Sequence, residues 1–208
     1  MTTRVAADSP GAIRNAIRVL QNGGLVAFPT DTLYGLGAQV RSASAIERLY
    51  TAKDRPRDRS IPVLIDSPDD LGKVAFNLPE KALRLAGTFW PGPLTLVAPR
   101  REDLPRILGP TQTIGVRVPD HPVARELLRR AGPLAVTSAN RSGGEGCVTA
   151  EQVEEALAGR VDLILDGGRC PGGMASTVAE IDGDELRILR EGPISLEALL
   201  ASLAGSVS

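Results

Sequence analysis

The stretch "TIGVRVPDHPVARELLRRAGPLAVTSAN", residues 113–140, decides the fold. The apolar run at 113–119 predicts a strand, and the segment 121–132 has the apolar spacing of an amphipathic helix. Residues 133–140 predict a second strand, which breaks into a glycine-rich loop. Strand, helix and strand in this order indicate a sheet covered by helices, so we expect an α/β or α+β fold around one mixed sheet.

The same alternation of strand and helix patterns continues on both sides of this stretch. A helix is expected to begin at a Ser9-Pro10 cap and to end at Gly23-Gly24. Further strands are predicted at 25–28, 61–65, 93–99, 163–166, 176–181 and 185–190. Further helices are predicted at 44–52, 67–75, 79–89, 149–158 and 195–203. No repeat, low-complexity segment or linker interrupts the pattern, so we expect a single domain over residues 1–208.

The composition of the 208-residue chain is that of a packed globular protein, with 42% hydrophobic and 24% charged residues. Its net charge of −1 provides no overall field to hold a nucleic acid, so any anion must be bound by a local cluster. The single histidine, His121, argues against Ser-His-Asp catalysis and multi-histidine zinc sites. We therefore predict no metal ligands, and chemistry that depends on Lys, Arg, Ser, Thr, Asp and backbone amides.

The sequence also bears on location. No apolar run approaches the ~20 residues of a membrane span, and the N-terminus lacks the apolar segment of a signal peptide. The two cysteines, Cys147 and Cys170, are too few for a disulfide scaffold and form no C-x-x-C pair. We therefore expect a cytoplasmic protein with no membrane partner.

A dense charge cluster precedes one of the predicted strands. The stretch "AKDRPRDRSIPVLI", residues 52–65, places six charges in the seven positions that start at Lys53. Lys53 and Arg55 can direct a point charge and a bidentate fork at one triphosphate. Alternatively, Asp54 and Asp58 neutralise these cations in surface pairs of little energetic consequence. Charge alone favours the second interpretation.

Several strands end in small polar residues instead of ordinary turns. The strand at 25–28 leads into Thr30-Asp31-Thr32, the strand at 133–140 ends in Thr137-Ser138-Ala139-Asn140, and the strand at 163–166 leads into Gly167-Gly168. Each segment alone is more typical of a capped turn. Taken together with the cation cluster, they favour one polar pocket beyond the strand ends.

Phosphate-binding motifs are weak. The sequence has no G-x-x-x-x-G-K-[ST] loop, and Gly35-x-Gly37 lacks the third glycine of a dinucleotide fingerprint. The glycine-rich loop at 141–146 offers backbone amides to an anion, although such a loop is more often only a surface loop.

A set of longer motifs is more specific than any of these features. The motifs are "GGLVAFPTDTLYGLGAQV", "KDRPRDRSIPVLI", "FWPGPLTLV", "IGVRVPDHPVARELL", "TSANRSG", "DGG" and "STV" with "LRILREG", in this order across residues 23–192. Together they resemble the YrdC/TsaC family of L-threonylcarbamoyladenylate synthases. The K-x-R and S-x-N signatures of that family match Lys53-Asp54-Arg55 and Ser138-Ala139-Asn140.

The resemblance implies a fold, a reaction and a set of partners. The fold is a YrdC/RibB-like twisted mixed sheet flanked by helices, with a large, positively lined cavity. The reaction is a nucleotidyl transfer in which L-threonine, bicarbonate as CO2 and ATP with Mg2+ give threonylcarbamoyl-AMP and pyrophosphate. The product serves threonylcarbamoyladenosine modification of tRNA, which implies contact with tRNA and with a downstream threonylcarbamoyl-transfer complex.

The resemblance also implies the residues of the site. Lys53 and Arg55 are the expected catalytic cations. The residues implied for ATP are Lys53, Arg55, Arg59, Thr113, Ser138, Ala139, Asn140, Cys147 and Arg190. Those implied for threonine are Thr32, Arg117, Thr137 and Ser176. Because carbamoyl adenylates are labile, we expect the loop at 141–146 to exclude water.

The sequence departs from some relatives, and two rival functions remain. Leu64 stands where some relatives have a threonine-binding histidine, and the chain ends soon after the last motif, as in the short, single-domain type. One rival is a non-catalytic module of the same fold that binds double-stranded RNA or tRNA, against which the net charge of −1 and the 3% aromatic content argue. The other is the carbamoyl transfer of hydrogenase-maturation factors, whose additional acylphosphatase and zinc-finger modules this chain lacks.

Overall fold

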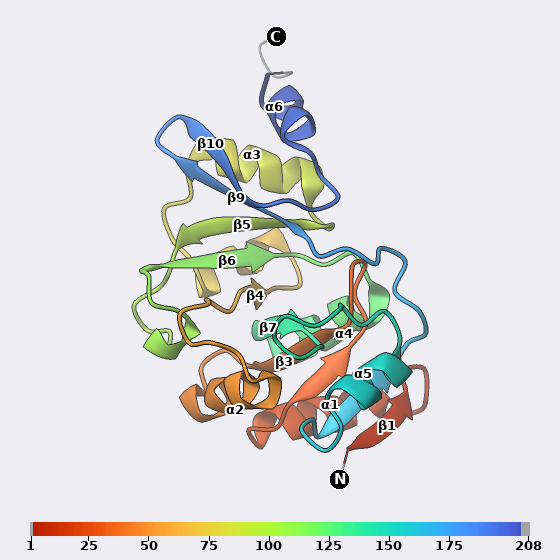
Figure 1. Cartoon of the computed structure of the whole chain (residues 1–208). Coiled ribbons are helices and arrows are strands. Elements are labelled where there is room, and N and C mark those ends of the chain that lie inside the picture. The colour runs from red at the N-terminus through yellow and green to blue at the C-terminus, as the bar shows by residue number, and fades with distance from the viewer. Residues whose placement is uncertain (1, 205–208) are drawn as a thin grey trace.

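Ten strands form one mixed sheet in the computed structural model, which describes residues 2–204 (Figure 1). The strands are β1 (Thr3–Ala6), β2 (Val26–Phe28), β3 (Gly35–Gln39), β4 (Val63–Leu64), β5 (Leu94–Pro99), β6 (Thr113–Arg117), β7 (Leu134–Ser138), β8 (Leu163–Asp166), β9 (Thr177–Asp182) and β10 (Glu185–Arg190). The α-helices are α1 (Ala12–Gln21), α2 (Ala43–Lys53), α3 (Glu80–Phe89), α4 (Pro122–Ala131), α5 (Ala150–Ala156) and α6 (Leu196–Ala204). Two 3-10 helices, η1 (Pro68–Lys73) and η2 (Arg106–Leu108), complete the regular structure.

The strand order is β1-β8-β2-β3-β7-β4-β6-β5-β9-β10, so the shortest strand lies near the middle. β4 pairs with β7 in the antiparallel sense and with β6 in the parallel sense, using only Val63 and Leu64. We call β4, with its two pairings, the seam of the sheet. Five strands lie on its β7 side and four on its β6 side. The prediction of a twisted mixed sheet flanked by helices is confirmed.

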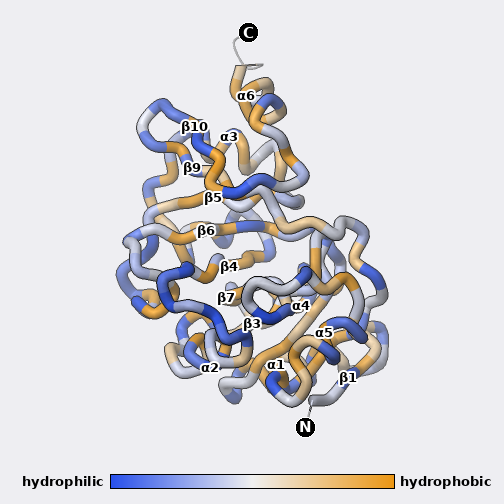
Figure 2. Tube along the Cα trace, viewed as in Figure 1, coloured by the Kyte–Doolittle hydropathy of each residue, from blue (hydrophilic) through white to orange (hydrophobic). Residues whose placement is uncertain are grey.

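The core is divided between the two faces of the sheet. Val26 and Phe28 of β2 belong to a cluster with the apolar residues of α1 and α4, whereas Ala27, between them, belongs to the larger cluster that includes α2. This division follows from the alternation of side chains along a strand. In α1, Ala12, Ala16 and Leu20 repeat every four residues and form its buried stripe. Figure 2 colours the trace by hydropathy and shows apolar residues, in orange, along many of the strands and polar residues, in blue, in many of the loops.

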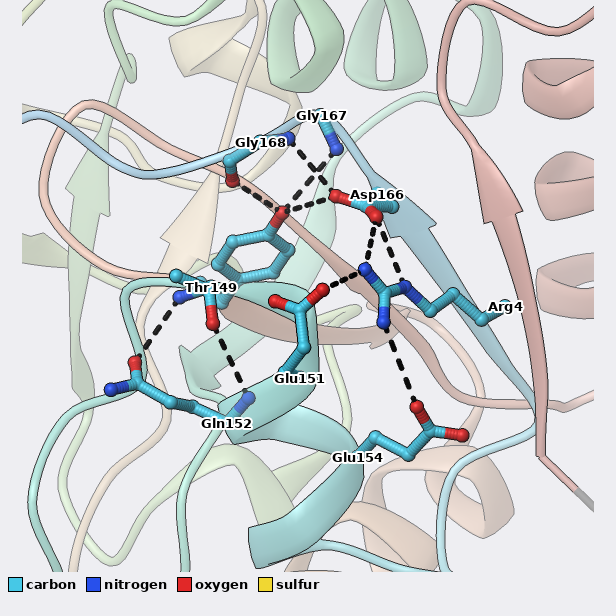
Figure 3. A network of polar contacts seen from close by, with 9 residues as sticks. Arg4, Thr149, Glu151, Gln152, Glu154, Asp166, Gly167 and Gly168 are labelled. Atoms are coloured by element: carbon cyan, nitrogen blue, oxygen red, sulfur yellow. Dashed lines mark hydrogen bonds and ion pairs between the residues drawn. The ribbon is translucent and has the colours of Figure 1, made fainter.

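An ionic network holds α5 against the edge of the sheet. Arg4 of β1 forms ion pairs with Glu151 and Glu154 of α5 and with Asp166 of β8 (Figure 3). All four side chains keep contact with solvent, so each pair contributes little stability. The network mainly fixes where α5 lies relative to β1 and β8.

The connection from β8 to β9 crosses much of the sheet. These strands are consecutive in the chain, yet six strands separate them in the sheet. The connection, residues 167–176, passes over the turn after β2, where the Gly173 amide donates to the Thr32 carbonyl at 2.8 Å (Figure 1). This strap, as we name residues 167–176, contacts the turn after β2 through Gly173 and then leads to Ser176, which contacts Thr95 of β5 in the other half of the sheet. No helix within residues 2–204 has the length and apolar character that a bilayer span requires.

The predicted strands all occur, but two observed strands were missed. β1 is a short, mostly exposed edge strand without an apolar pattern, and it exists because it pairs with β8. β3 contains Gly35 and Gly37, which the sequence favoured only as a weak nucleotide motif. A Cβ atom on Gly35 would lie 2.7 Å from Val136 Cγ1, and one on Gly37 would lie 2.9 Å from Phe28 Cε1. The glycines therefore allow neighbouring side chains to lie across the strand.

Three other boundaries differ from expectation. The Ser9 cap is wrong, because α1 begins after Gly11, which has φ 82° and makes no side-chain cap bond. The strand predicted at 61–65 is reduced to β4, since Pro62 has no N–H to donate. The helix predicted at 67–75 is the 3-10 helix η1.

We predict opposite effects for two glycine substitutions. Gly37→Ala should lower the free energy of unfolding by about 1–3 kcal/mol, because the new methyl group overpacks against buried Phe28. Gly87→Ala, on the exposed side of α3 with nothing within 4 Å of the new Cβ, should raise it by about 0.5–1 kcal/mol. Urea unfolding of both variants measures the two values. A destabilised Gly87→Ala or an unaffected Gly37→Ala would contradict this explanation of β3.

Candidate functional site

A cavity of about 120 Å³ lies at the seam of the sheet and is lined from both of its halves. The β7 side contributes Thr30, Thr32, Thr137 and Ser138, and the other side contributes Arg117, Thr95, Ser176 and Arg190. Leu64 of β4 and Arg55, which follows α2, complete this part of the wall. Two of the three polar strand ends predicted to converge do so, those of β2 and β7, whereas Gly167-Gly168 after β8 do not line the cavity. The cavity is smaller than the ~300–1,000 Å³ of typical ligand pockets, so only a small molecule fits inside it.

Arg117 is the most constrained cation of the cavity. Its side chain is 5% exposed and donates to the Gly92 carbonyl at 2.9 Å, to Thr32 Oγ1 at 3.0 Å and to Asp31 Oδ1. Asp31 Oδ1 also accepts the Asp120 amide at 3.0 Å. A guanidinium has five N–H groups. Acceptors among the described residues use three of them, so two remain for a ligand. Asp31 was named only as part of a polar turn, and its pairing with Arg117 was not predicted.

A hydroxyl pair lies on the β5–β9 wall of the cavity. Thr95 Oγ1 and Ser176 Oγ are 2.8 Å apart, and Arg190 Nη2 donates to Ser176 Oγ at 3.0 Å. Arg190 also donates to the Ser176 carbonyl at 2.7 Å, so the two residues predicted for different ligands are in contact. Thr95 was missed, although a threonine inside the otherwise apolar strand at 93–99 is a signal that could have found it.

Lys53 does not point into open solvent. It is the last residue of α2, and its 1% exposed side chain donates to the Ser138 carbonyl at 2.5 Å and to the Asn140 carbonyl. The chain turns away at Asp54, whose φ of 51° is left-handed. Burial, together with the charge of Arg55, lowers the pKa of Lys53 to about 7. The lysine therefore ties the end of α2 to the S-x-N segment after β7.

The neighbouring charges separate into two groups. Arg55 lines the cavity and donates to the Ser60 carbonyl at 2.8 Å. Arg57 is exposed and pairs with Glu47 of α2. Asp54 forms its ion pairs with Arg141 and Arg160 at 2.9 Å each. The alternative in which Asp54 neutralises Lys53 or Arg55 is therefore wrong.

The S-x-N segment borders a second hollow. Asn140 lines it together with Cys147, Gly144 and neighbouring residues of α5. Asn140 Nδ2 donates to the Gly144 carbonyl at 2.7 Å, which folds the loop at 141–146 back on itself. Asn140 Oδ1 is buried and has no partner within the described residues. Burial raises the pKa of the Cys147 thiol, so this side chain is not an activated nucleophile.

The remaining predicted residues lie outside the cavity. The Arg59 side chain is exposed, and its carbonyl accepts from Tyr50 at 3.1 Å. The Thr113 hydroxyl lies 3.0 Å from that of Thr111 at the start of β6. Ala139 is fully buried, and its amide donates to the Tyr34 carbonyl at 2.7 Å. These residues do not line the cavity, so they can contact only a ligand that extends beyond it.

The electrostatics of the cavity favour an anion. Burial lowers the pKa of the guanidinium of Arg55, Arg117 and Arg190, which shows that each loses hydration. Arg117 is paired with Asp31, but Arg55 and Arg190 have no ion-pair partner within residues 2–204. No carboxylate from that part of the chain lines the cavity. An anionic ligand would restore the interactions that these cations lose on burial. Over the same residues, no cluster of three or more His, Cys, Asp or Glu side chains forms a candidate metal site.

Comparison with known proteins gives close relatives in sequence. Threonylcarbamoyl-AMP synthase of Pyrococcus abyssi is 41% identical over 189 residues, 90% of this chain and 56% of that protein. The Bacillus subtilis protein of the same name is 39% identical over 97% of this chain and 59% of its own length. A putative threonylcarbamoyl-AMP synthase of Mycobacterium tuberculosis is 40% identical over 90% of this chain and 87% of its own length. The chain thus spans less than two thirds of the first two relatives.

Solved structures and a family model agree with these matches. The structure of P. abyssi Sua5 complexed with L-threonine superposes with a TM-score of 0.91 and 38% identity, covering 98% of this chain and 60% of that one. Escherichia coli YciO superposes with a TM-score of 0.84 and 28% identity, covering 96% and 98%. The model of the Sua5/YciO/YrdC family, described as "Telomere recombination", matches residues 18–192. The chain therefore belongs to the Sua5/YciO/YrdC family.

Proposed function

We propose that this protein is an L-threonylcarbamoyladenylate synthase, which converts L-threonine, bicarbonate and ATP into threonylcarbamoyl-AMP and pyrophosphate. The observation that carries the proposal is the cavity itself, in which the clamped guanidinium of Arg117 faces a wall of hydroxyls. Such a cavity suits a small hydroxylated amino acid. The relatives named threonylcarbamoyl-AMP synthase and the L-threonine complex of P. abyssi Sua5 support the same substrate.

Threonine occupies the cavity in this proposal. The two unused N–H groups of Arg117 receive its carboxylate in a bidentate contact. Thr32, Thr137 and Ser176 provide the remaining polar contacts, and all three line the cavity. Leu64, in the same wall, offers an apolar surface to the substrate methyl group.

ATP, bound as its magnesium complex, lies outside the cavity because a cavity of about 120 Å³ is too small for both substrates. Its phosphates meet Arg55 and Arg190 at the cavity wall and the ammonium of Lys53 beside it. The other residues proposed for the nucleotide surround this position: Arg59, Thr113, Ser138, Ala139, Asn140 and Cys147. When bound to the nucleotide, Mg2+ would supply further positive charge to the phosphates beside these cations.

The chemistry requires positioning and charge neutralisation. The neutral amine of threonine adds to CO2 and loses a proton, which gives a carbamate. A carbamate oxygen then attacks the α-phosphorus, the bond to the bridging oxygen breaks, and pyrophosphate leaves. No covalent enzyme intermediate is formed, so Lys53 and Arg55 act by stabilising the charge that develops on the leaving group. The loop at 141–146 protects the labile product from water.

The product is proposed to serve threonylcarbamoyladenosine formation in tRNA, in the cytoplasm, through a downstream transfer complex. Direct contact with tRNA belongs to the same proposal. Pyrophosphate release that requires ATP, bicarbonate and L-threonine together is the experiment that tests the function. Release that is indifferent to threonine would reject it.

We predict that Lys53→Ala and Arg55→Ala each reduce threonine-dependent pyrophosphate release about 10²–10³-fold, the loss typical of one charge-stabilising donor. Part of the loss should appear in kcat, because the leaving group gains charge only in the transition state. Arg57→Ala is the matched control, since Arg57 lies in the same cluster but pairs with Glu47 on the surface. The control should stay within about twofold of the wild type. If Lys53→Ala and Arg55→Ala release pyrophosphate at the wild-type rate, the cluster is only a solvated loop.

A second prediction concerns Arg117→Lys. This substitution keeps the charge but loses the fork, so the KM for threonine should rise at least about tenfold. The KM for ATP should change much less, because the nucleotide lies outside the cavity. Circular dichroism and a thermal melt check that the variant is folded. A folded variant with an unchanged threonine KM would return Arg117 to a structural role.

The lowered pKa of Lys53 predicts a pH dependence of nucleotide binding. Lys53 is protonated below its pKa of about 7 and neutral above it, so affinity for MgATP should fall as the pH rises from 7 to 8.5. The loss is at most roughly tenfold per pH unit. Terminal phosphates stay ionised in this range, because their second pKa is about 6. Calorimetric titrations of wild type and Lys53→Met measure the effect, and a slope that persists in the variant would assign it to another group.

A further inference from the structure

Thr95 is a buried polar residue on the cavity wall that was not among the expected site residues. It lies in β5, its side chain is 4% exposed, and it lines the cavity beside Ser176. Its hydroxyl has one hydrogen-bond partner within the described residues, Ser176 Oγ at 2.8 Å. A buried hydroxyl with remaining hydrogen-bonding capacity that faces a cavity is available to a ligand.

The hydrogen atoms of the Thr95–Ser176 pair can be counted. The two hydroxyls carry two hydrogens, and one of these is used in the bond between them. The two oxygens have four lone pairs. The mutual bond uses one of them, and the bond from Arg190 Nη2 to Ser176 Oγ uses another. Whichever residue donates in the mutual bond, the pair keeps one O–H donor and two free lone pairs. A ligand hydroxyl, which both donates and accepts, satisfies this combination, whereas a carboxylate only accepts.

The orientation of Thr95 is fixed by its neighbour in β6. A Cβ atom on Gly115 would lie 2.9 Å from Thr95 Cγ2, so the threonine methyl group occupies the space that a side chain at position 115 would need. With the methyl group seated against Gly115, the hydroxyl lies toward Ser176. A β-branched side chain has few rotamers to exchange between. The pair is therefore preorganised for its ligand.

The charges of the cavity separate the two ends of a bound amino acid. Arg117 has two N–H groups for the α-carboxylate, as described above, and the Thr95–Ser176 pair lies on the β5–β9 wall. We propose that Thr95 is a specificity-determining residue, which together with Ser176 binds the side-chain hydroxyl of a β-hydroxy amino acid and excludes its isostere valine. This inference rests on the proposed function and adds a residue to its substrate site.

A site that binds a substrate hydroxyl rejects the analogue without it, because its own polar groups are left unpaired. Removing the hydroxyl of Thr95 should therefore weaken the use of threonine but not that of valine. In Thr95→Val, which keeps the shape of the side chain, kcat/KM for threonine should fall about 10–100-fold. The ratio of kcat/KM for threonine to kcat/KM for valine should fall by at least about tenfold.

The test measures pyrophosphate release with threonine and with valine in four variants. Thr95→Ser keeps the hydroxyl and should hold the threonine-to-valine ratio within about threefold of the wild type. Thr88→Val in α3 makes the same chemical change away from the cavity and should alter neither rate. Thr95→Ala also removes the hydroxyl, but introduces a smaller side chain than valine. It should lower the threonine-to-valine ratio in the same way, and it replaces Thr95→Val if that variant does not fold.

The outcomes distinguish this inference from the function on which it rests. A narrowed ratio in Thr95→Val or Thr95→Ala that is restored in Thr95→Ser supports the inference. An unchanged ratio, or an equal loss with both amino acids, overturns it and leaves Thr95 a packing residue. A wild-type protein that releases no pyrophosphate with threonine rejects the proposed function instead, whatever the variants do.

Discussion

Val63 and Leu64 of β4 hold the two halves of the sheet together, because β4 pairs with β7 on one side and with β6 on the other. Leu64 lines the cavity, so the cavity lies against this junction. Side chains from strands on both sides of β4 complete the wall. The strap links the same two halves a second time, since its Gly173 contacts Thr32 on the β7 side and its Ser176 contacts Thr95 on the other side. The site thus lies where β4 and the strap join the two halves of the sheet.

Burial of cations is the main energetic cost of this arrangement. Lys53, Arg55, Arg117 and Arg190 all have their pKa values lowered by loss of hydration. Carbonyl and hydroxyl oxygens accept from some of their N–H groups, but only Arg117 has a carboxylate partner within the described residues. Such a site is less stable empty than filled, since a bound anion supplies the missing charge. Ligand affinity and fold stability are therefore linked through the same four side chains.

The sequence was sufficient for the fold class and for the polar strand ends, because both depend on local patterns. Alternation of apolar residues identified the strand that carries Arg117, and the hydroxyls after β2 and β7 do meet in one cavity. β3 could not be found in this way, since its glycines have low strand propensity and are required by Phe28 and Val136 on neighbouring strands. The reach of Lys53 to the Ser138 carbonyl likewise depends on a contact 85 residues away, which no local pattern contains.

The same separation in sequence explains why Thr95 and Asp31 were missed. A single polar residue in an apolar strand, such as Thr95, indicates a buried polar contact. Its partner Ser176 cannot be identified locally, because it lies 81 residues further along the chain. Asp31 pairs with Arg117 across 86 residues. Local patterns therefore located the walls of the cavity, whereas the tertiary fold decides which of their side chains touch.

The pairing of β8 with both β1 and β2 has a consequence for how the chain is made. β2 can pair with β3 as soon as both leave the ribosome, but its other edge has no partner until residues 163–166 are synthesised. At about 5–20 residues per second, that wait is on the order of ten seconds. During this time an apolar strand edge of the nascent chain is open to other chains, a hazard that chaperones limit. The N-terminal strand β1, which waits longest for its partner, is short and mostly exposed in the fold.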